Sequence, residues 1–443
     1  MIVVEIENDS KVPFAVALAV RPAADAPAKA IRDISAEGTE VRVDGKLALL
    51  AGRAPGRRVA ATASEGGVAP VVLGGNAHPE AAVAARCADR RAEAALVFPL
   101  AHAATLRVVL PLDGGALDVQ ALPAAAQVAS GWRSHAGKGA RIEVPDRRLK
   151  EAVDSNICHL LLRPEGLAVA AALSRFGHAA EAATTLLGNP AATATTGTPG
   201  EALLALAAHW TLTRDDEFAD RAVPLVATLV EALGRRGTPE ELHLGAIATS
   251  GAAGILAAAG QSQGADDVRR AGQAMSVASA DVSPPPMPTG IEPVLELLRT
   301  ASPTWTWAGP DDPHALSVAA ALLVAVRNLL VSETSGPAME LELSPGVPAD
   351  WYGQGWEVHG LPTAHGAISY AVRWHGDRPA LLWELTPWPG AAPVRLTAPA
   401  LDRTWSSDQA SGEALLAPLP LPEPTVGSVT TEVVLGRKPA GPD

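Results

Sequence analysis

The chain has 443 residues, of which 48% are hydrophobic and 19% charged, and it carries a formal net charge of −13 at pH 7. It is too apolar for a disordered chain and too long for one ordinary domain, so two or three domains are expected. The acidic balance argues against a nucleic-acid groove, and the two cysteines, Cys87 and Cys158, exclude a disulfide scaffold or a Cys-rich zinc site.

The N-terminal sequence and the lengths of the apolar runs indicate whether the protein is secreted or inserted in a membrane. No basic segment followed by an apolar core and a small-residue cleavage site opens the chain, so no secretory signal is expected. The apolar runs, such as Val318–Val326, are far shorter than the roughly 20 residues of a membrane span. We therefore expect a soluble cytoplasmic protein with no membrane partner. Because Ile2–Glu7 already has a strand pattern, we also expect part of its domain to lie upstream.

Residues 1–145 are predicted to form an N-terminal β-sandwich. Short segments of alternating apolar and polar residues follow one another from Ile2 onward, separated by Gly and Pro. Asp44-Gly45 stands between the strand patterns Glu40–Val43 and Leu47–Leu50, and Asp-Gly is typical of a two-residue hairpin turn.

Residues 146–335 change to helical spacing. Glu201–Leu212 and Glu217–Leu233 form the clearest helical hairpin, and Pro313–Val331 is a long apolar helix. Stacked antiparallel hairpins are how helical toroids and solenoids bury a core. Residues 336–443 return to an alternating pattern, with Ala367–Trp374 the clearest strand and Val429–Val434 a later one, and are predicted to form a small C-terminal β-sandwich.

The order β-sandwich, helical hairpins, β-sandwich resembles the six-hairpin (α/α toroid) glycosidase superfamily, which holds glucoamylase-like, debranching-like and rhamnosidase-like enzymes. Three segments carry the resemblance: a helical hairpin with an aromatic-x-Leu-Thr-x-Asp turn (Glu201–Leu233), an aromatic loop with a closing helix (Ser302–Val331), and a run with Pro-Gly-x-Pro and Pro-Thr-x-x-Gly motifs (Leu343–Trp374). The helical region is shorter than six hairpins require at about 11–12 residues per helix, so we expect a shortened or divergent member with an incomplete or open ring.

The resemblance implies a glycoside-hydrolase-like protein that acts on or binds an α-linked carbohydrate and needs no cofactor. Related enzymes often carry a Gly-Asp-Gly-His-type motif where this chain has Gly-Pro-Asp-Asp-Pro-His (Gly309–His314). Prolines thus replace the glycines that would let the backbone approach a sugar. A non-catalytic carbohydrate-binding or scaffold relative is therefore the alternative.

Glycoside hydrolysis needs two carboxyl groups that flank one bond. Glu165, on a loop before a predicted helix, is the candidate acid, and Asp311 or Asp312 is the candidate base. Each also fits a structural role, because acidic residues at a helix N-terminus cap the helix and complement its dipole.

The candidate substrate-binding residues are Trp305, Trp307, His314 and His359. If Trp305-Thr306-Trp307 is extended, its two indoles lie on one side and form a stacking platform beside Asp311; alternatively they plug the helical domain against the C-terminal one. The two histidines could bond a sugar hydroxyl or be structural. The chain has no His-Glu-x-x-His or Cys-x-x-Cys motif, so no metal site is predicted.

Overall fold

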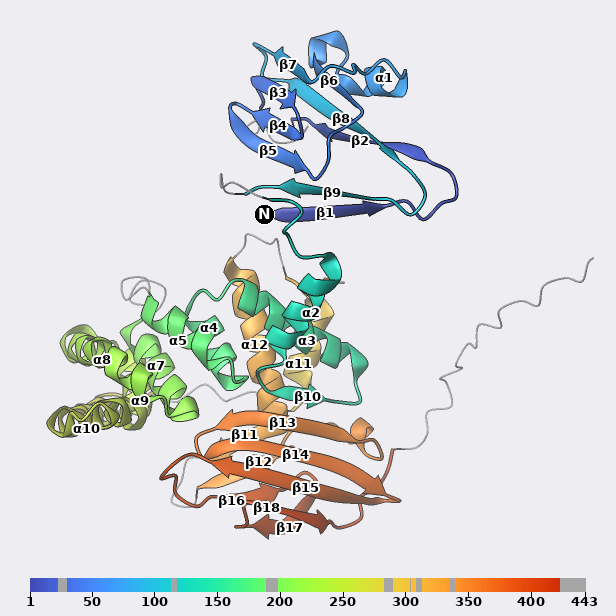
Figure 1. Ribbon diagram of the computed structural model, residues 1–443. Helices are drawn as coiled ribbons and strands as arrows, with labels where there is room; N and C mark the ends of the chain where they lie inside the picture. The colour runs from blue at the N-terminus through green and yellow to red at the C-terminus, as the bar shows by residue number, and fades with distance from the viewer. Residues whose placement is uncertain are drawn as a thin grey trace, which may run out of the picture. The chain divides into compact units, whose positions relative to one another are not determined.

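The computed structural model describes residues 1–22, 30–112, 118–188, 198–282, 290–302, 304–307, 313–334 and 339–422 (Figure 1). Packing divides the chain into two units, Met1–Gly131 and Trp132–Asp443. The fold class is confirmed at the level of a mixture of helices and several β-sheets. The finer division into domains 1–145, 146–335 and 336–443 stays a prediction, and the predicted strand Val429–Val434 lies outside the described residues.

The first unit packs two antiparallel sheets against each other. A six-stranded sheet has the order β1-β9-β5-β4-β3-β7 and a three-stranded sheet the order β2-β8-β6, and Ile34, Val41, Leu96 and Phe98 lie in the core between them. The predicted turn at Asp44-Gly45 is confirmed, because both residues have the positive φ that such a turn requires. The elements are β1 (Ile2–Glu7), β2 (Phe14–Val20), β3 (Asp33–Glu37), β4 (Glu40–Val43), β5 (Lys46–Ala51), β6 (Arg57–Thr62), α1 (Val68–Leu73), β7 (Ala82–Arg86), β8 (Ala92–Leu100) and β9 (Thr105–Leu110).

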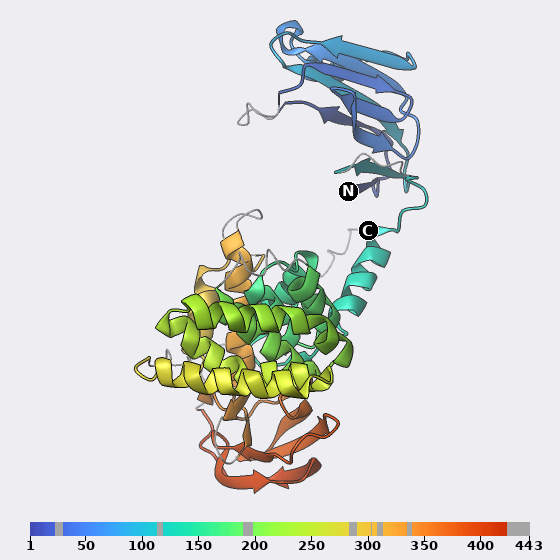
Figure 2. The ribbon, with the colours of Figure 1, turned by 90° about the vertical axis from the view of Figure 1, so that its left-hand side faces the viewer.

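The helices of the second unit form two layers. In the inner row α12 packs against α4, α4 against α7, and α7 against α9. The outer helices cover this row: α5 packs on α4 and α7, α8 packs on α7 and α9, and α10 packs on α9. Figure 2 shows the same helical layer from a second direction. The helices are α2 (Ala125–Ala136, at the unit boundary), α3 (Arg147–Leu162), α4 (Leu167–Arg175), α5 (Ala179–Gly188), α7 (Pro199–Thr213), α8 (Asp216–Arg236), α9 (Pro239–Ala258), α10 (Ser262–Ala278), α11 (Glu292–Thr300) and α12 (Pro313–Leu330).

Small residues let the inner helices α7 and α9 approach closely. A Cβ at Gly254 would stand 2.2 Å from the Trp210 ring, and one at Gly200 would stand 2.7 Å from the Glu241 carbonyl oxygen. These contacts pair the start of α7 with the start of α9 and the end of α7 with the end of α9, so the two helices are parallel. The hairpin partners α9 and α10 are antiparallel, because Gly245 of α9 lies against Met275 near the end of α10.

Two sheets complete the second unit, with the orders β10-β13-β14-β15-β18 and β11-β12-β16-β17 (Figure 1). α12 continues directly into β11, and one hydrophobic cluster joins α3, α4, α11 and α12 to both sheets; Leu160, Leu323, Trp356 and Leu341 are among its members. The strands are β10 (Arg141–Glu143), β11 (Val331–Thr334), β12 (Glu340–Leu343), β13 (Trp356–Thr363), β14 (Gly366–His375), β15 (Arg378–Pro387), β16 (Arg395–Ala398), β17 (Asp402–Ser407) and β18 (Ser411–Leu415).

α9 and α10, at the far end of the helical layer, test whether the ring closes and whether any helix could span a membrane. α9 and α10 find their main partners in α7, α8 and each other, so among the described helices the row is open at this end. A closed or incomplete toroid stays a prediction. By length and composition alone α9 could cross a membrane, although 39% of its most apolar stretch is buried within this structure. A helix of a helical core passes the same test, and the expected lack of a membrane partner stays a prediction.

Candidate functional site

The direction of the inner helices decides which predicted site residues lie at the same end. α4, α7 and α12 pack side by side, and Arg175, Arg214 and Arg327 near their C-terminal ends all lie around Glu333 and Ala364. The three helices are therefore parallel, and α9 is parallel to α7. Their N-terminal ends together form what we call the N-terminal rim. Glu165 precedes α4 by one residue and lies at this rim.

Glu165 is exposed, and its backbone N–H donates to the Arg163 carbonyl oxygen at 2.8 Å. Within the described part of the chain, no hydrogen bond or ion pair engages its carboxylate. Its counterparts at α7 and α9 differ, because Glu201 and Glu241 close capping boxes with Thr198 and Thr238. Among the described residues, the Glu165 side chain therefore does not cap α4, which is the structural role that its position before the helix suggests.

The remaining predicted acids, Asp311 and Asp312, directly precede α12 in the sequence, and His314 lies at its start. Asp311 and Asp312 lie outside the described residues. The backbone of His314 belongs to the first turn of α12, which starts at the N-terminal rim, and its side chain also lies outside the described part. The roles predicted for these three residues stay predictions.

The two tryptophans do not form the expected paired platform. The segment is a turn rather than an extended strand, because Trp305 has a φ of 57° and its N–H donates to the Ser302 carbonyl oxygen at 3.0 Å. Trp307 is buried in the core, and its indole N–H bonds the Leu297 carbonyl oxygen and the Thr300 hydroxyl, both at 3.1 Å. Trp307 is therefore a core residue, and Trp305 is the more accessible indole of the pair; whether they plug the helical domain against the C-terminal one stays a prediction.

Trp305 lies beside an arginine and three hydroxyl groups, which its position in the sequence does not predict. The guanidinium carbon of Arg148 lies 5.7 Å from its ring centroid. Three hydroxyl groups gather on the same turn, with the Ser302 oxygen 3.0 Å from that of Thr304 and 2.7 Å from that of Thr306. A half-buried indole beside hydroxyl and guanidinium donors provides both an apolar face and hydrogen-bonding groups.

Glu165 and Trp305 do not contact each other, because they lie near opposite ends of α3. Arg148 lies in the first turn of α3, whereas Glu165 follows the last turn of the same helix. At 1.5 Å per residue these two turns are about 20 Å apart along the axis. Any ligand that reaches both groups has to be longer than one sugar ring.

His359 lies on β13 opposite Arg141 of β10, and it is half-buried. Its Nε2 atom lies 3.0 Å from a carboxylate oxygen of Glu357, which also pairs with Arg373. The ring is therefore already engaged in a cluster on the surface of the sheet. Its predicted role as a sugar ligand stays a prediction.

The opposite end of the inner helices holds a buried polar cluster. Arg327 is almost fully buried and pairs with Glu333, whose second carboxylate oxygen accepts the Ala364 N–H at 2.9 Å. Arg214, stacked 4.2 Å from the Trp210 ring centroid, donates to the Ala364 carbonyl oxygen. We call Arg175, Arg214, Arg327, Glu333 and His365 the C-terminal cluster.

Charge in the C-terminal cluster is balanced by the helices themselves. Each helix C-terminus carries about half a negative charge, so three such ends together with Glu333 roughly match three guanidinium groups. Burial, followed by repulsion from Arg327, lowers the pKa of Arg175 to about 10, while Glu333 opposes the shift. Burial also lowers the pKa of His365. The cluster therefore fixes the β13–β14 turn to the helices and needs no added ion.

Some of these features left signals in the sequence. Arginines in the last turns of apolar helices are favoured by the helix dipole, and Arg175 and Arg327 both fit that pattern. The repeated Thr-Pro-x-Glu of Thr198–Glu201 and Thr238–Glu241 marks two helix starts at the same end. The hydroxyls that alternate in Ser302–Thr306 were readable too, but their convergence depends on the turn at Trp305.

In the part of the chain that the structure describes, no group of three or more His, Cys, Asp or Glu side chains could hold a metal ion. No protein-family model matches the chain, and no curated protein matches it. Among solved structures it is similar to a GH78-family rhamnosidase of Bacillus sp. GL1, with 12% identity and a TM-score of 0.37 over 89% of this chain and 53% of that one. The chain thus spans about half the length of that enzyme, and a TM-score this low establishes neither a shared fold nor a shared activity. The resemblance to the toroid glycosidases stays a prediction.

Proposed function

We propose that this protein is a glycoside-hydrolase-like protein that binds an α-linked carbohydrate at the Trp305 turn. The observation that carries the proposal is the turn itself, where one accessible indole stands beside the Ser302, Thr304 and Thr306 hydroxyls and the Arg148 guanidinium. Indole rings offer a flat apolar face to the C–H side of a sugar, while hydroxyl and guanidinium groups exchange hydrogen bonds with its oxygens.

Binding is supported by more observations than hydrolysis. Hydrolysis requires a second carboxyl group within about 10 Å of the acid. Glu165 supplies one free carboxylate at the N-terminal rim, and Asp311 or Asp312 is proposed as its partner from the sequence alone. The alternative of a non-catalytic relative is favoured by the burial of Trp307, which removes half of the predicted stacking platform.

Calorimetric titration of the full chain with α-linked di- and trisaccharides tests binding. We expect Trp305→Ala to weaken binding at least tenfold, because the stacking surface is lost. Trp356→Phe is the control for loss of an indole, because Trp356 is fully buried on β13 and cannot contact a ligand. Lack of binding by the wild type to every sugar, or unchanged binding by Trp305→Ala, would remove the proposal.

Catalysis is tested separately with aryl α-glycosides. If Glu165 is the acid, Glu165→Gln should abolish turnover while it leaves the affinity for the sugar unchanged. Turnover retained by Glu165→Gln excludes that role. Binding without any turnover by the wild type assigns the protein to the non-catalytic alternative.

A further inference from the structure

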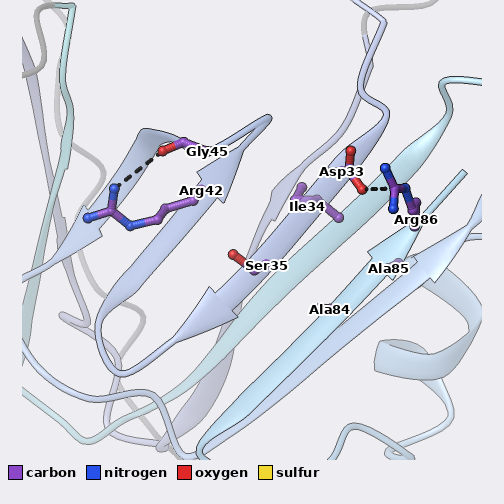
Figure 3. Close-up of a pocket in the computed structure, with 8 residues that line it drawn as sticks. All are labelled: Asp33, Ile34, Ser35, Arg42, Gly45, Ala84, Ala85 and Arg86. Atoms are coloured by element: carbon purple, nitrogen blue, oxygen red, sulfur yellow. Dashed lines mark hydrogen bonds and ion pairs between the residues drawn. The ribbon is translucent and has the colours of Figure 1, made fainter.

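The outer face of the six-stranded sheet in the first unit carries a polar trough that no step above uses. It lies across the neighbouring strands β4, β3 and β7, where Arg42, Ser35 and Ala84 stand opposite one another in a single row (Figure 3). β3 is hydrogen-bonded on both sides, so its backbone has no free groups here. Only side chains can serve a ligand at this face.

Small residues make the trough. Ser35 and Ala84 form its floor, and the hollow above them measures about 280 Å³. A second hollow of about 250 Å³ shares Ser35 and Arg42 and extends toward the turn at Gly38. A volume near 300 Å³ is at the lower end of the range for small-molecule sites, and it suits a ligand of about one sugar ring.

Both sides of the trough are held by ion pairs. The Nε atom of Arg86 lies 3.0 Å from a carboxylate oxygen of Asp33, and the two side chains meet at one rim in Figure 3. On the other side the Arg42 Nε donates to Glu40 at 2.9 Å, and the same guanidinium reaches the Gly45 carbonyl oxygen. Each pair places a guanidinium and a carboxylate at the solvent-exposed edge of the trough, with N–H groups and lone pairs left over for a ligand.

The charges of the trough select against anions. Glu37 stands directly opposite Glu40 on the neighbouring strand, an arrangement of like charges that costs stability. Counted over both hollows, the carboxylates of Asp33, Glu37 and Glu40 outnumber the guanidinium groups of Arg42 and Arg86 by one, and both glutamates line the second hollow. Its lining holds no aromatic side chain, which excludes recognition by stacking. A neutral molecule with several hydroxyl groups can use both the donors and the acceptors.

We propose that this trough is a second binding site, for a neutral carbohydrate held by hydrogen bonds from the two ion pairs. The site extends the carbohydrate specificity proposed above to the first unit, and it is chemically different from the Trp305 turn because it binds hydroxyl groups without an aromatic platform. Ligands here are monosaccharide-sized and uncharged, so the corresponding uronic acids bind more weakly.

Ligand-observed NMR and calorimetry on the full chain test the site, with methyl α-glucoside, methyl α-mannoside, methyl α-galactoside and methyl α-glucuronide as probes. Ser35→Leu fills the floor without any change of charge, and Ser35→Thr is the matched control with a retained hydroxyl. We expect two sites in the wild type, loss of one in Ser35→Leu, and loss of the other in Trp305→Ala. An Arg86→Gln variant should weaken the trough site at least fivefold.

The outcomes separate the two proposals. If Ser35→Leu binds every probe as the wild type does, the trough site is overturned, and the Trp305 site stands or falls by its own variant. If Trp305→Ala retains all binding and Ser35→Leu loses it, the trough site stands and the proposed function fails. If methyl α-glucuronide binds as tightly as methyl α-glucoside to the trough, the charge argument is wrong and the site is not the one proposed.

Discussion

The two ends of the inner helical row differ in how their charged groups are used. At the C-terminal cluster Arg327 and Glu333 are bonded to each other and to the β13–β14 turn, and burial shifts the pKa of Arg175 and His365. At the N-terminal rim Glu165 is exposed, with a carboxylate that is free in the described structure. One end therefore ties the helices to the C-terminal sheets, while the other leaves a carboxylate open to solvent.

The largest expected effect comes from breaking the ion pair of the C-terminal cluster. Arg327→Met should cost about 3–4 kcal/mol in the free energy of unfolding, because it leaves the partly buried Glu333 without its guanidinium partner. Urea unfolding followed by tryptophan fluorescence measures the loss. Arg235→Met removes an exposed i,i+4 pair with Glu231 and should cost less than about 0.5 kcal/mol. Equal costs for the two variants would contradict the comparison.

Acid should weaken the molecule through His209, which is buried beside the C-terminal cluster. Its Nδ1 atom lies 2.8 Å from the Ser174 hydroxyl, and burial lowers its pKa to about 4, with Asp215 opposing the shift. The unfolded chain binds this proton at a higher pH than the folded one. Stability is therefore fully present above about pH 6.5 and falls as the pH drops toward 4, by up to about 3 kcal/mol.

Unfolding measured between pH 7 and pH 4 in the wild type and in His209→Gln checks this effect. The glutamine variant should lose part of the pH dependence, while His102→Gln, at an exposed histidine of the first unit, should keep the wild-type profile. A profile of His209→Gln that is parallel to the wild type over this range would show that His209 is not the titrating group.

Close packing of α7 on α9 should be equally sensitive at both ends. Gly200→Ala and Gly254→Ala should each cost about 1–3 kcal/mol, because the added methyl group has no room. Gly234→Ala in α8, where a Cβ meets nothing within 4 Å, should instead stabilise by about 0.5–1 kcal/mol. Thermal melts of the three variants measure these changes. A large cost for Gly254→Ala with a small cost for Gly200→Ala would show that the N-terminal rim is less tightly packed than the opposite end.

The smallest effect is expected at Glu165. Glu165→Gln should change the free energy of unfolding by less than about 0.5 kcal/mol, because the carboxylate is exposed and no described residue pairs with it. Glu201→Gln, at the start of the neighbouring inner helix, keeps an acceptor for the Thr198 N–H but loses its charge, and should cost slightly more. Chemical denaturation of both variants decides the order. A cost above about 1 kcal/mol for Glu165→Gln would assign it a structural role.

Periodicity alone was enough to predict most of the elements. Alternation predicted the strands on either side of Asp44-Gly45. The apolar spacing together with capping residues predicted the hairpin of α7 and α8, in which Asp215 is the N-cap of α8. These features are local, so neighbouring residues decide them. The strand Ala82–Arg86 was less readable, because it consists mostly of alanine and pairs with a distant partner, β3.

The candidate site was harder to predict because it depends on turns and on contacts over long stretches of chain. Alternation placed Trp305 and Trp307 on one face, but the positive φ of Trp305 breaks the extended backbone that alternation assumes, and only Trp307 is fully buried. The contact between Arg148 and Trp305 joins residues more than a hundred positions apart, which no periodicity reveals. Only the parallel direction of the inner helices places Glu165 and the start of α12 at one end.

The shared core of α3, α12 and the C-terminal sheets has a consequence for synthesis on the ribosome. The first unit can fold once its own residues have emerged, and the cluster of α7–α10 is likewise complete within a short stretch of chain. Leu149 and Leu160 of α3 belong to a cluster whose last member is Leu416. Because α3 packs mainly on α12, which ends at Leu330, its apolar face stays uncovered during translation until α12 has been made.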